Sequence, residues 1–96
     1  MTVKDFDRLP TIHYTQMPAP QPDSPVYQEV LTFRRELPRL LAEGNEGKWA
    51  LIKGNEIIGV YDSFDDADRV GLKQFLSERY ILQPVREWQP LLRMRY

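Results

Sequence analysis

Four aspartates stand close together in the middle of this chain and are its strongest candidates for chemistry. They are Asp62, Asp65, Asp66 and Asp68. Carboxylate oxygens gathered in this way could hold a hard cation such as Mg²⁺ or Ca²⁺. The run lacks the alternating ligands, the glycine and the final glutamate of an EF-hand loop. Because Ser63 is a good helix N-cap and a helix start favours negative charge, we predict that these aspartates begin a helix and bind no metal.

The rest of the chain offers little for catalysis. Its one histidine, His13, lies in a proline-flanked segment, and cysteine is absent. A thiolate nucleophile, a disulfide and a cysteine-based metal site are therefore excluded. Gly44 and Gly47 lack the Lys-Ser/Thr ending of a phosphate-binding loop, and no pattern places two carboxylates across a pocket. We predict that the protein is not an enzyme and has no catalytic residue, cofactor or metal.

Charge is distributed unevenly along the chain, although the net charge is only −1. Residues 56–68 are acidic, whereas residues 69–96 carry six basic side chains against two glutamates. Guanidinium groups and aromatic rings occur together near the C-terminus, as they do in single-stranded nucleic-acid sites, in Arg86, Trp88, Arg93, Arg95 and Tyr96. Because the pI is about 5.8, an interface or a solvated edge explains them better than nucleic-acid binding does.

Length and composition indicate one small domain. The chain has 96 residues and 11.4 kDa, of which 42% are hydrophobic and 28% charged, proportions that are ordinary for a globular protein. No apolar run approaches the roughly 20 residues of a membrane span, and the first residues lack the pattern of a secretory leader. We therefore expect a cytoplasmic protein that does not bind membranes.

Residues 1–23 are predicted to form a proline-rich N-terminal arm. The stretch 17–22 contains three prolines and should be extended, with polyproline character and no packed core. Residues 9–14 are apolar enough to lie against the domain or against a neighbouring chain. Ile12 and Tyr14 are accordingly candidate interface residues.

A core domain over residues 24–86 should begin with a helix. Ser24-Pro25 suits the N-cap and the first helical position, and Gly44-Asn45 supplies a stop. Pro38 removes a backbone hydrogen bond, so we expect a kink or a break near Leu37. Apolar residues recur four and three positions apart, which places them on one stripe facing a sheet: Val26, Val30, Phe33, Leu37 and Leu40.

Two strands are predicted within residues 48–62, joined by a two-residue turn at Gly54-Asn55. An unbroken register would set these pairs opposite each other: Trp49 with Val60, and Ala50 with Gly59. Small side chains would then leave space near Trp49, Ala50, Gly59 and Tyr61. Both faces of the hairpin are apolar, which requires cover by two helices or by one helix and a partner subunit.

A second helix should begin after Ser63 and turn one apolar face to the sheet, with Gly71 close to Gly59. Leu72 and Leu76 then point away from that face and are the first interface candidates. A third strand follows at residues 81–85, parallel to the second strand because a helix connects them. Residues 87–96 form an extension that alternates as an edge strand does, and its interface candidates are Trp88, Leu92, Met94 and Tyr96.

The core sequence resembles a family of small bacterial domains of unknown function. The resemblance covers residues 24–86 and rests on Gly47-Lys48-Trp49, a hairpin, and Gly59 followed by Asp62-Ser63-Phe64-Asp65-Asp66-Ala67. It implies a fold and no activity. The chain departs from the family pattern at Ala50 and at residues 68–70, which bears on the closeness of the relationship.

These observations predict an α+β domain ordered helix–strand–strand–helix–strand, with a small mixed three-stranded sheet and a fourth terminal strand as an option. The function we favour is a non-enzymatic protein–protein interaction, assembly or adaptor module that self-associates or serves as a small subunit of a complex. The alternative is a small ligand-binding or regulatory module with a site between helix and sheet, and the third hypothesis is an aspartate-based metal enzyme.

Overall fold

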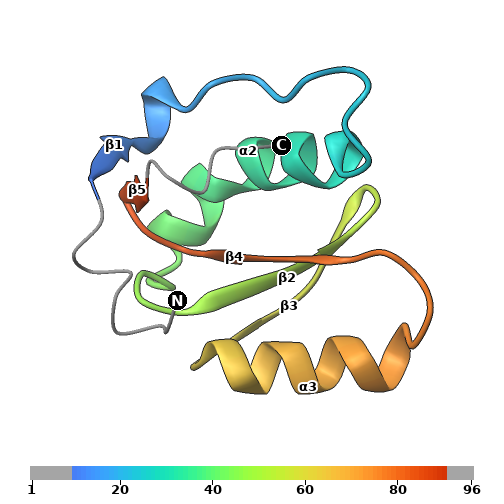
Figure 1. Cartoon of the computed structure of the whole chain (residues 1–96). Helices are drawn as coiled ribbons and strands as arrows, with labels where there is room; N and C mark the ends of the chain where they lie inside the picture. The colour runs from blue at the N-terminus through green and yellow to red at the C-terminus, as the bar shows by residue number, and fades with distance from the viewer. Residues whose placement is uncertain (1–9, 91–96) are drawn as a thin grey trace.

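The fold, seen in a computed structural model that describes residues 10–90, has a three-stranded sheet with one helix on each face (Figure 1). A second sheet of two short strands joins the two ends of the described chain. This confirms an α+β domain ordered helix–strand–strand–helix–strand. The elements in chain order are β1 (Thr11–His13), η1 (Tyr14–Gln16), α2 (Tyr27–Ala42), β2 (Trp49–Lys53), β3 (Glu56–Tyr61), α3 (Phe64–Gln74), β4 (Ile81–Pro84) and β5 (Trp88–Pro90).

The three-stranded sheet has the order β3-β2-β4 and every neighbouring pair in it is antiparallel. The prediction of a mixed sheet is therefore wrong. β3 and β4 do run in the same direction, because each is antiparallel to β2, but they are not neighbours. The connection through α3 crosses over β2, which occupies the middle position, so no parallel pair is formed.

The hairpin register shifts by one residue between Leu51 and Ile52, so the predicted unbroken pairing is also wrong. Ile52 lies opposite Ile57 but Leu51 lies opposite Gly59, which leaves Ile58 as the extra residue of a β-bulge. Beyond the bulge the observed pairs are Ala50 with Val60 and Trp49 with Tyr61. The two-residue turn is as predicted, and Gly54 has the positive φ of 59° that its first position requires.

The predicted apolar stripe of α2 packs on one face of the sheet. Four of its five residues, Val30, Phe33, Leu37 and Leu40, are almost fully buried. Phe33, Leu37 and Leu40 meet Ala50 and Ile52 of β2, together with Val85, in one hydrophobic cluster. A second, smaller cluster on the other face joins the neighbouring β2 residue Trp49 to α3 at Phe64 and Ala67. The two helices therefore cover the two faces, which decides between the alternatives left open by the sequence.

The start and the interior of α2 differ in detail from the sequence-based expectation. The helix begins at Tyr27, with Val26 as N-cap, and the Ser24 hydroxyl instead accepts a bond from the Val26 amide at 3.3 Å. Pro38 lies inside the helix, which continues to Ala42, so no break occurs at Leu37. Pro38 is exposed, where water can satisfy the carbonyl that loses its partner.

The C-terminus of α2 closes as predicted, at Gly44 with φ 81°. The Gly44 amide donates to the carbonyl of Leu41 and the Asn45 amide to that of Leu40, both at 3.1 Å. These two bonds form a Schellman motif, which satisfies carbonyls at the helix end.

Polar side chains of α2 form hydrogen bonds with the backbone of the hairpin turn, which the sequence did not predict. The buried Glu29 carboxylate accepts a hydrogen bond of 2.8 Å from the Gly54 amide. The Thr32 hydroxyl contacts the Gly54 carbonyl at 2.6 Å, and Arg35 donates to the Asn55 carbonyl at 3.0 Å. The turn is thereby held to the helix by hydrogen bonds as well as by the apolar contacts nearby.

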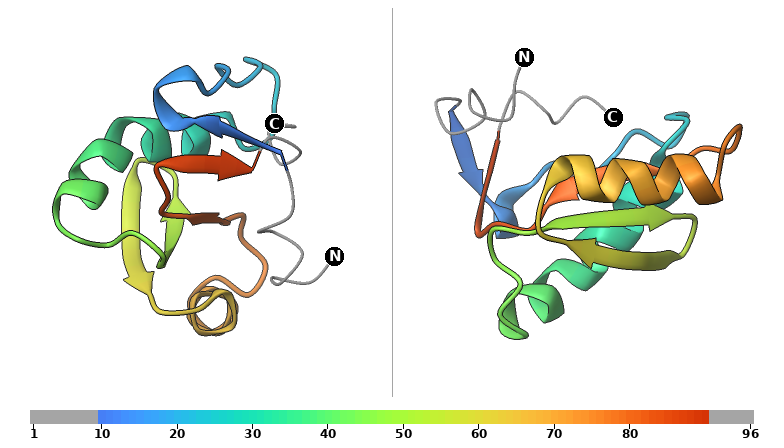
Figure 2. Two further views of the ribbon diagram at one scale, coloured as in Figure 1. Left: turned by 90° about the vertical axis from the view of Figure 1, so that its left-hand side faces the viewer. Right: turned by 90° about the horizontal axis from the view of Figure 1, so that it is seen from below.

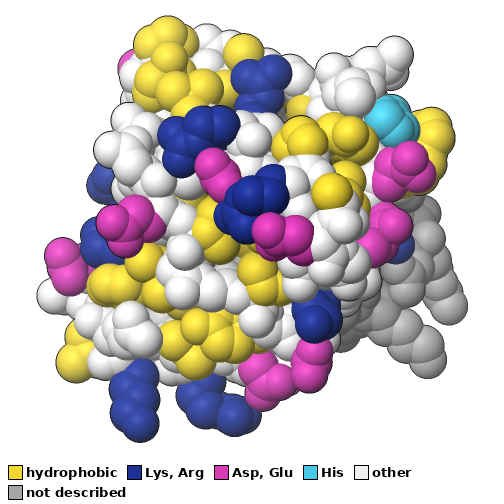
Figure 3. All heavy atoms as spheres, turned by 180° about the vertical axis from the view of Figure 1, so that it is seen from behind, with side chains coloured by type: hydrophobic (Ala, Val, Ile, Leu, Met, Phe, Trp, Pro, Cys, Tyr) yellow, Lys and Arg dark blue, Asp and Glu magenta, His cyan; other side chains and the backbone are white. Residues whose placement is uncertain are grey.

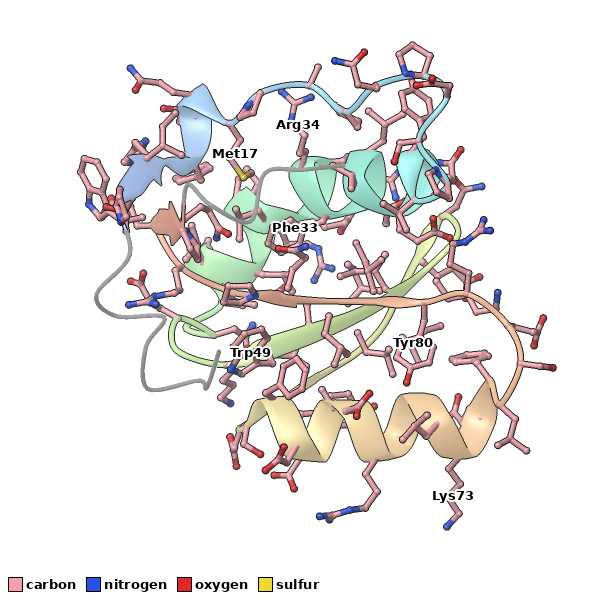
Figure 4. All side chains as sticks on the ribbon, viewed as in Figure 1. Met17, Phe33, Arg34, Trp49, Lys73 and Tyr80 are labelled. Carbon is pink, nitrogen blue, oxygen red and sulfur yellow. The ribbon has the colours of Figure 1, made fainter. Side chains whose placement is uncertain are left out.

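The N-terminal arm, where described, is packed and not simply extended. β1 pairs antiparallel with β5, Met17 is buried in the α2 cluster, and Pro20 is buried too. Arg34 donates to the Met17 carbonyl at 3.3 Å, and Figure 4 shows Met17 reaching from the arm toward α2. The expectation of a stretch without packing is wrong, because a methionine side chain can enter the core from an extended backbone. Within the predicted terminal segment 87–96, the described residues 88–90 form β5, which pairs with the arm and not with the three-stranded sheet.

Replacing Glu29 by Ala should destabilise the fold by about 1–3 kcal/mol, because the part-buried Gly54 amide loses its acceptor. The measurement is the free energy of unfolding from denaturant titration. Glu43→Ala is the matched control: Glu43, just after α2, is exposed and forms a surface ion pair with Arg39, so its loss should change stability by about 0.5 kcal/mol or less. Equal effects of the two substitutions would contradict the role assigned to Glu29.

Candidate interaction surfaces

The N-terminus of α3 is capped as the sequence predicts. The Ser63 hydroxyl accepts a 3.1 Å hydrogen bond from the Asp66 amide, and Asp65 and Asp66 lie in the first turn. The aspartates then take separate partners: Asp62 lies 4.0 Å from Lys48, and Asp66 lies 3.7 Å from Arg69. Among residues 10–90, no group of three or more His, Cys, Asp or Glu side chains is arranged to hold a metal ion.

Two tyrosine rings occupy the spaces that the glycines leave on the α3 side of the sheet. A Cβ on Gly71 would lie 2.6 Å from the Tyr80 ring, and a Cβ on Gly59 would lie 2.4 Å from the Tyr61 hydroxyl. Gly71 therefore does not pack on Gly59 as predicted, because each glycine accommodates a ring. The Tyr80 hydroxyl continues past Gly71 and donates to Asp68 at 2.9 Å.

The four residues proposed to line a ligand site do not share one space. Ala50 belongs to the cluster under α2, whereas Trp49 and Tyr61 belong to the cluster under α3. Trp49 contacts the Phe64 ring edge to face, with the centroids 5.1 Å apart. The room expected beside Gly59 is filled by the Tyr61 side chain. Because neighbouring residues of a strand face opposite ways, Trp49 and Ala50 could meet in one site only if the strand were broken.

Leu72 and Leu76 lie on the outside of the molecule, with 50% and 85% of their surfaces exposed. α3 ends at Gln74, so Leu76 belongs to the turn that follows the helix rather than to its outer face. Lys53 fixes this turn: its ammonium group donates to the Arg79 carbonyl at 3.2 Å and lies 5.4 Å from the centre of the Phe75 ring. The exposed leucines are thus presented from an anchored backbone, beside a Lys73 that points away from the sheet (Figure 4).

A second exposed apolar side chain, Trp88, lies on the β1–β5 ribbon with 53% of its surface exposed. The His13 ring contacts it edge to face, with centroids 5.1 Å apart. Ile12 and Tyr14, also predicted for an interface, are half-buried against the α2 cluster of the same chain. Figures 1 and 2 place this ribbon and the C-terminal end of α3 at opposite ends of the molecule. Leu92, Met94 and Tyr96 lie outside the described residues.

The described helices include none that is both long enough and apolar enough to cross a membrane. Comparison of the chain with protein-family models, with curated proteins and with solved structures found no match. The resemblance to a family of small bacterial domains therefore stays a prediction, as does any function that depends on relatives.

The Tyr80 hydroxyl gives the fold a dependence on alkaline pH. Burial, and secondly the hydrogen bond to Asp68, raise the pKa of Tyr80 above its usual value of 10.0. Above about pH 10 the unfolded chain loses this proton while the folded chain retains it, so stability falls as the pH rises until the folded group also ionises. Tyr80→Phe should flatten this part of a stability profile measured between about pH 8 and pH 12. A profile identical in slope to that of the wild type would contradict the assignment.

Gly71 and Tyr80 should be strongly coupled in stability. Gly71→Ala should destabilise the wild type, because the new Cβ would lie 2.6 Å from the Tyr80 ring. With Tyr80 replaced by Ala, the same substitution should stabilise by about 1 kcal/mol, the usual helix preference for Ala over Gly. A double-mutant cycle of unfolding free energies measures the coupling. Additive effects would mean that the ring does not require the glycine.

Proposed function

We propose that the protein is a non-enzymatic interaction module, acting in the cytoplasm as an assembly or adaptor unit. It either associates with itself or serves as a small subunit of a larger complex. The observation that carries the proposal is the exposure of two leucines, Leu72 and Leu76, at one end of α3. Singly exposed apolar residues are ordinary, but Leu72 near the end of α3 and Leu76 in the anchored turn that follows form a surface that a partner can cover.

The anchoring of this turn supports the proposal energetically. A side chain on a fixed backbone loses less conformational entropy on binding than one on a mobile loop. Lys53 holds the turn through the Arg79 carbonyl and lies 3.8 Å from the Glu78 carboxylate. Lys73 and Arg69 are exposed beside the leucines and can form the polar rim that surrounds an apolar contact.

Trp88 supports a second contact region on the β1–β5 ribbon. Tryptophan is enriched among the residues that contribute most to binding, because it buries a large rigid surface. Its contact with the His13 ring limits the orientations that it can take. Since the two regions are at opposite ends of the molecule (Figure 2), one chain could contact two partners and link them, as an adaptor does.

The test replaces both leucines by aspartate and measures the solution mass by light scattering over a concentration series. Leu72→Asp with Leu76→Asp should abolish the association made through this leucine surface, because a charge at the centre of an interface loses its water without gaining a partner. Gln74→Asp with Ser77→Asp is the matched control, since these two residues are exposed, polar and close by in the chain. If the wild type is monomeric alone, the same variants are compared for copurification with partners from the native source. Unchanged association of the leucine variant in both measurements would refute this surface.

A further inference from the structure

The three-stranded sheet has two outer edges, and they differ in their capacity to bind another strand. Val85 donates to the Lys48 carbonyl at 2.8 Å, which sets the alternation of bonds between β4 and β2. The next pair along the ladder, Pro84 opposite Trp49, is therefore a pair without hydrogen bonds between β4 and β2. The nitrogen of Pro84 accordingly points away from β2, toward the outer edge of β4. The outer edge of β4 therefore lacks a donor at that position. A proline so placed is one of the devices that protect a sheet edge from pairing.

The outer edge of β3 contains no proline, although a bulge interrupts the strand at Ile58. It runs for six residues from Glu56 to Tyr61, with neither proline nor charge between Glu56 and Asp62. Within the described part of the chain, no strand pairs with its outer edge. Every residue of β3 is at least partly exposed, whereas four of the five residues of β2 are buried. An apolar edge of this length is a template for a further strand.

The hairpin turn determines which backbone groups of β3 point outward. A two-residue turn closes on a hydrogen-bonded pair, here Lys53 and Glu56, and bonded pairs then alternate along the ladder. Leu51 and Trp49 are the next β2 residues that bond toward β3. The β3 residues directed away from β2 are therefore Ile57 and Val60, one on each side of the bulge.

These outward groups are arranged so that β3 can pair with a second copy of itself. Two copies of β3 would pair antiparallel about a two-fold axis between residues 58 and 59. Ile57 of each copy would then lie opposite Val60 of the other copy. Each of the four residues then gives and accepts a backbone hydrogen bond. Ile58, the extra residue of the bulge, is half-buried and belongs to neither hydrophobic cluster, and it would be covered near the axis.

The charges of α2 beside this edge are also self-complementary. α2 lies mainly over β2 and β3, and its ion pairs form a ladder of alternating sign, Arg35, Glu36, Arg39 and Glu43. Figure 3, viewed from the side of β3, shows acidic and basic side chains alternating across this face, with hydrophobic side chains both above and below them. In a dimer with a two-fold axis, the α2 charges of the two copies run in opposite directions. The basic end at Arg35 then faces the acidic end at Glu43 of the second copy.

We infer that two copies of this chain pair through the outer edges of β3 and build one continuous six-stranded antiparallel sheet. The inference extends the proposed function by naming the partner as a second copy. It uses a surface other than Leu72, Leu76 and Trp88, so either can fail without the other. An isologous contact of this kind closes after two subunits and leaves the leucines of both copies free for other partners.

The test measures the solution mass of the full-length protein over a concentration series, with one variant at each surface. The wild type should reach twice 11.4 kDa. Ile58→Lys should weaken association about tenfold or more. A lysine on an edge strand protects the edge from pairing, and the two positively charged lysines of a dimer would lie close together near the two-fold axis. Leu72→Lys is the matched control, a comparable change at a half-exposed leucine on the other surface, and should leave this dimer intact.

A second measurement needs no substitution. Hydrogen exchange is followed at the amides of Ile57 and Val60 in the wild-type protein, at concentrations above and below the mass transition. Both amides should exchange slowly only in the dimer, while that of Leu51, bonded within the hairpin, should be protected in both states. This readout separates edge pairing from a variant that merely fails to fold.

The outcomes separate the two proposals. Loss of the dimer in Ile58→Lys but not in Leu72→Lys, with the two amides protected, supports the β3 pairing. Loss in Leu72→Lys alone overturns it and supports the leucine surface instead. A monomer at all concentrations overturns it as well and leaves the leucines for a different protein. The amides of Ile57 and Val60 could instead be protected from exchange only when an unrelated strand-forming peptide is added. That result would overturn the choice of a second copy as the partner.

Discussion

The burial of β2 on both of its faces is the constraint on which the rest of this structure depends. Its four residues from Trp49 to Ile52 are all buried, and alternate ones point to opposite faces of the sheet. A strand of this kind needs an apolar layer above it and another below it. Helix α2 supplies one layer through Phe33, Leu37 and Leu40, and α3 supplies the other through Phe64 and Ala67. Among the described elements, α2, α3, β3 and β4 all contact this one strand.

Within residues 10–90, side chains that the sequence offered for chemistry take part in local contacts. The Asp66 amide donates to the Ser63 cap, and the carboxylates of Asp62, Asp66 and Asp68 lie near Lys48, Arg69 and the Tyr80 hydroxyl respectively. The glycines that might have opened a cavity accommodate tyrosine rings. The exposed features without a described covering element lie at the periphery: Leu72 in α3, Leu76 in the turn after it, Trp88 in β5 and the outer edge of β3. These are features that recognise other polypeptides, which is why the proposals concern association.

The bulge at Ile58 links the local fold to this periphery. It moves Val60 opposite Ala50, where it contributes to the cluster under α2. It also leaves Ile58 at an edge where neither hydrophobic cluster includes it. Glu29, Thr32 and Arg35 hold the adjoining turn against α2, so the strand is fixed in position while its outer backbone groups stay available. A rigid edge loses little entropy when another strand pairs with it.

The amino-acid sequence alone determined the local elements. The Ser63 cap, the Gly54-Asn55 turn, the glycine that ends α2 and the spacing from Val30 to Leu40 are signals read within a few residues, because each reflects the hydrogen bonds and periodicity of one element. The exposure of Leu72 also followed from helical periodicity. Tertiary structure decided the rest: the one-residue register shift, the central place of β2, the burial of Met17, the grip of Glu29 on the turn and the rings over Gly59 and Gly71. Each depends on contacts between residues far apart in the chain or on competition for space in the core, and no local pattern records which neighbour will occupy that space.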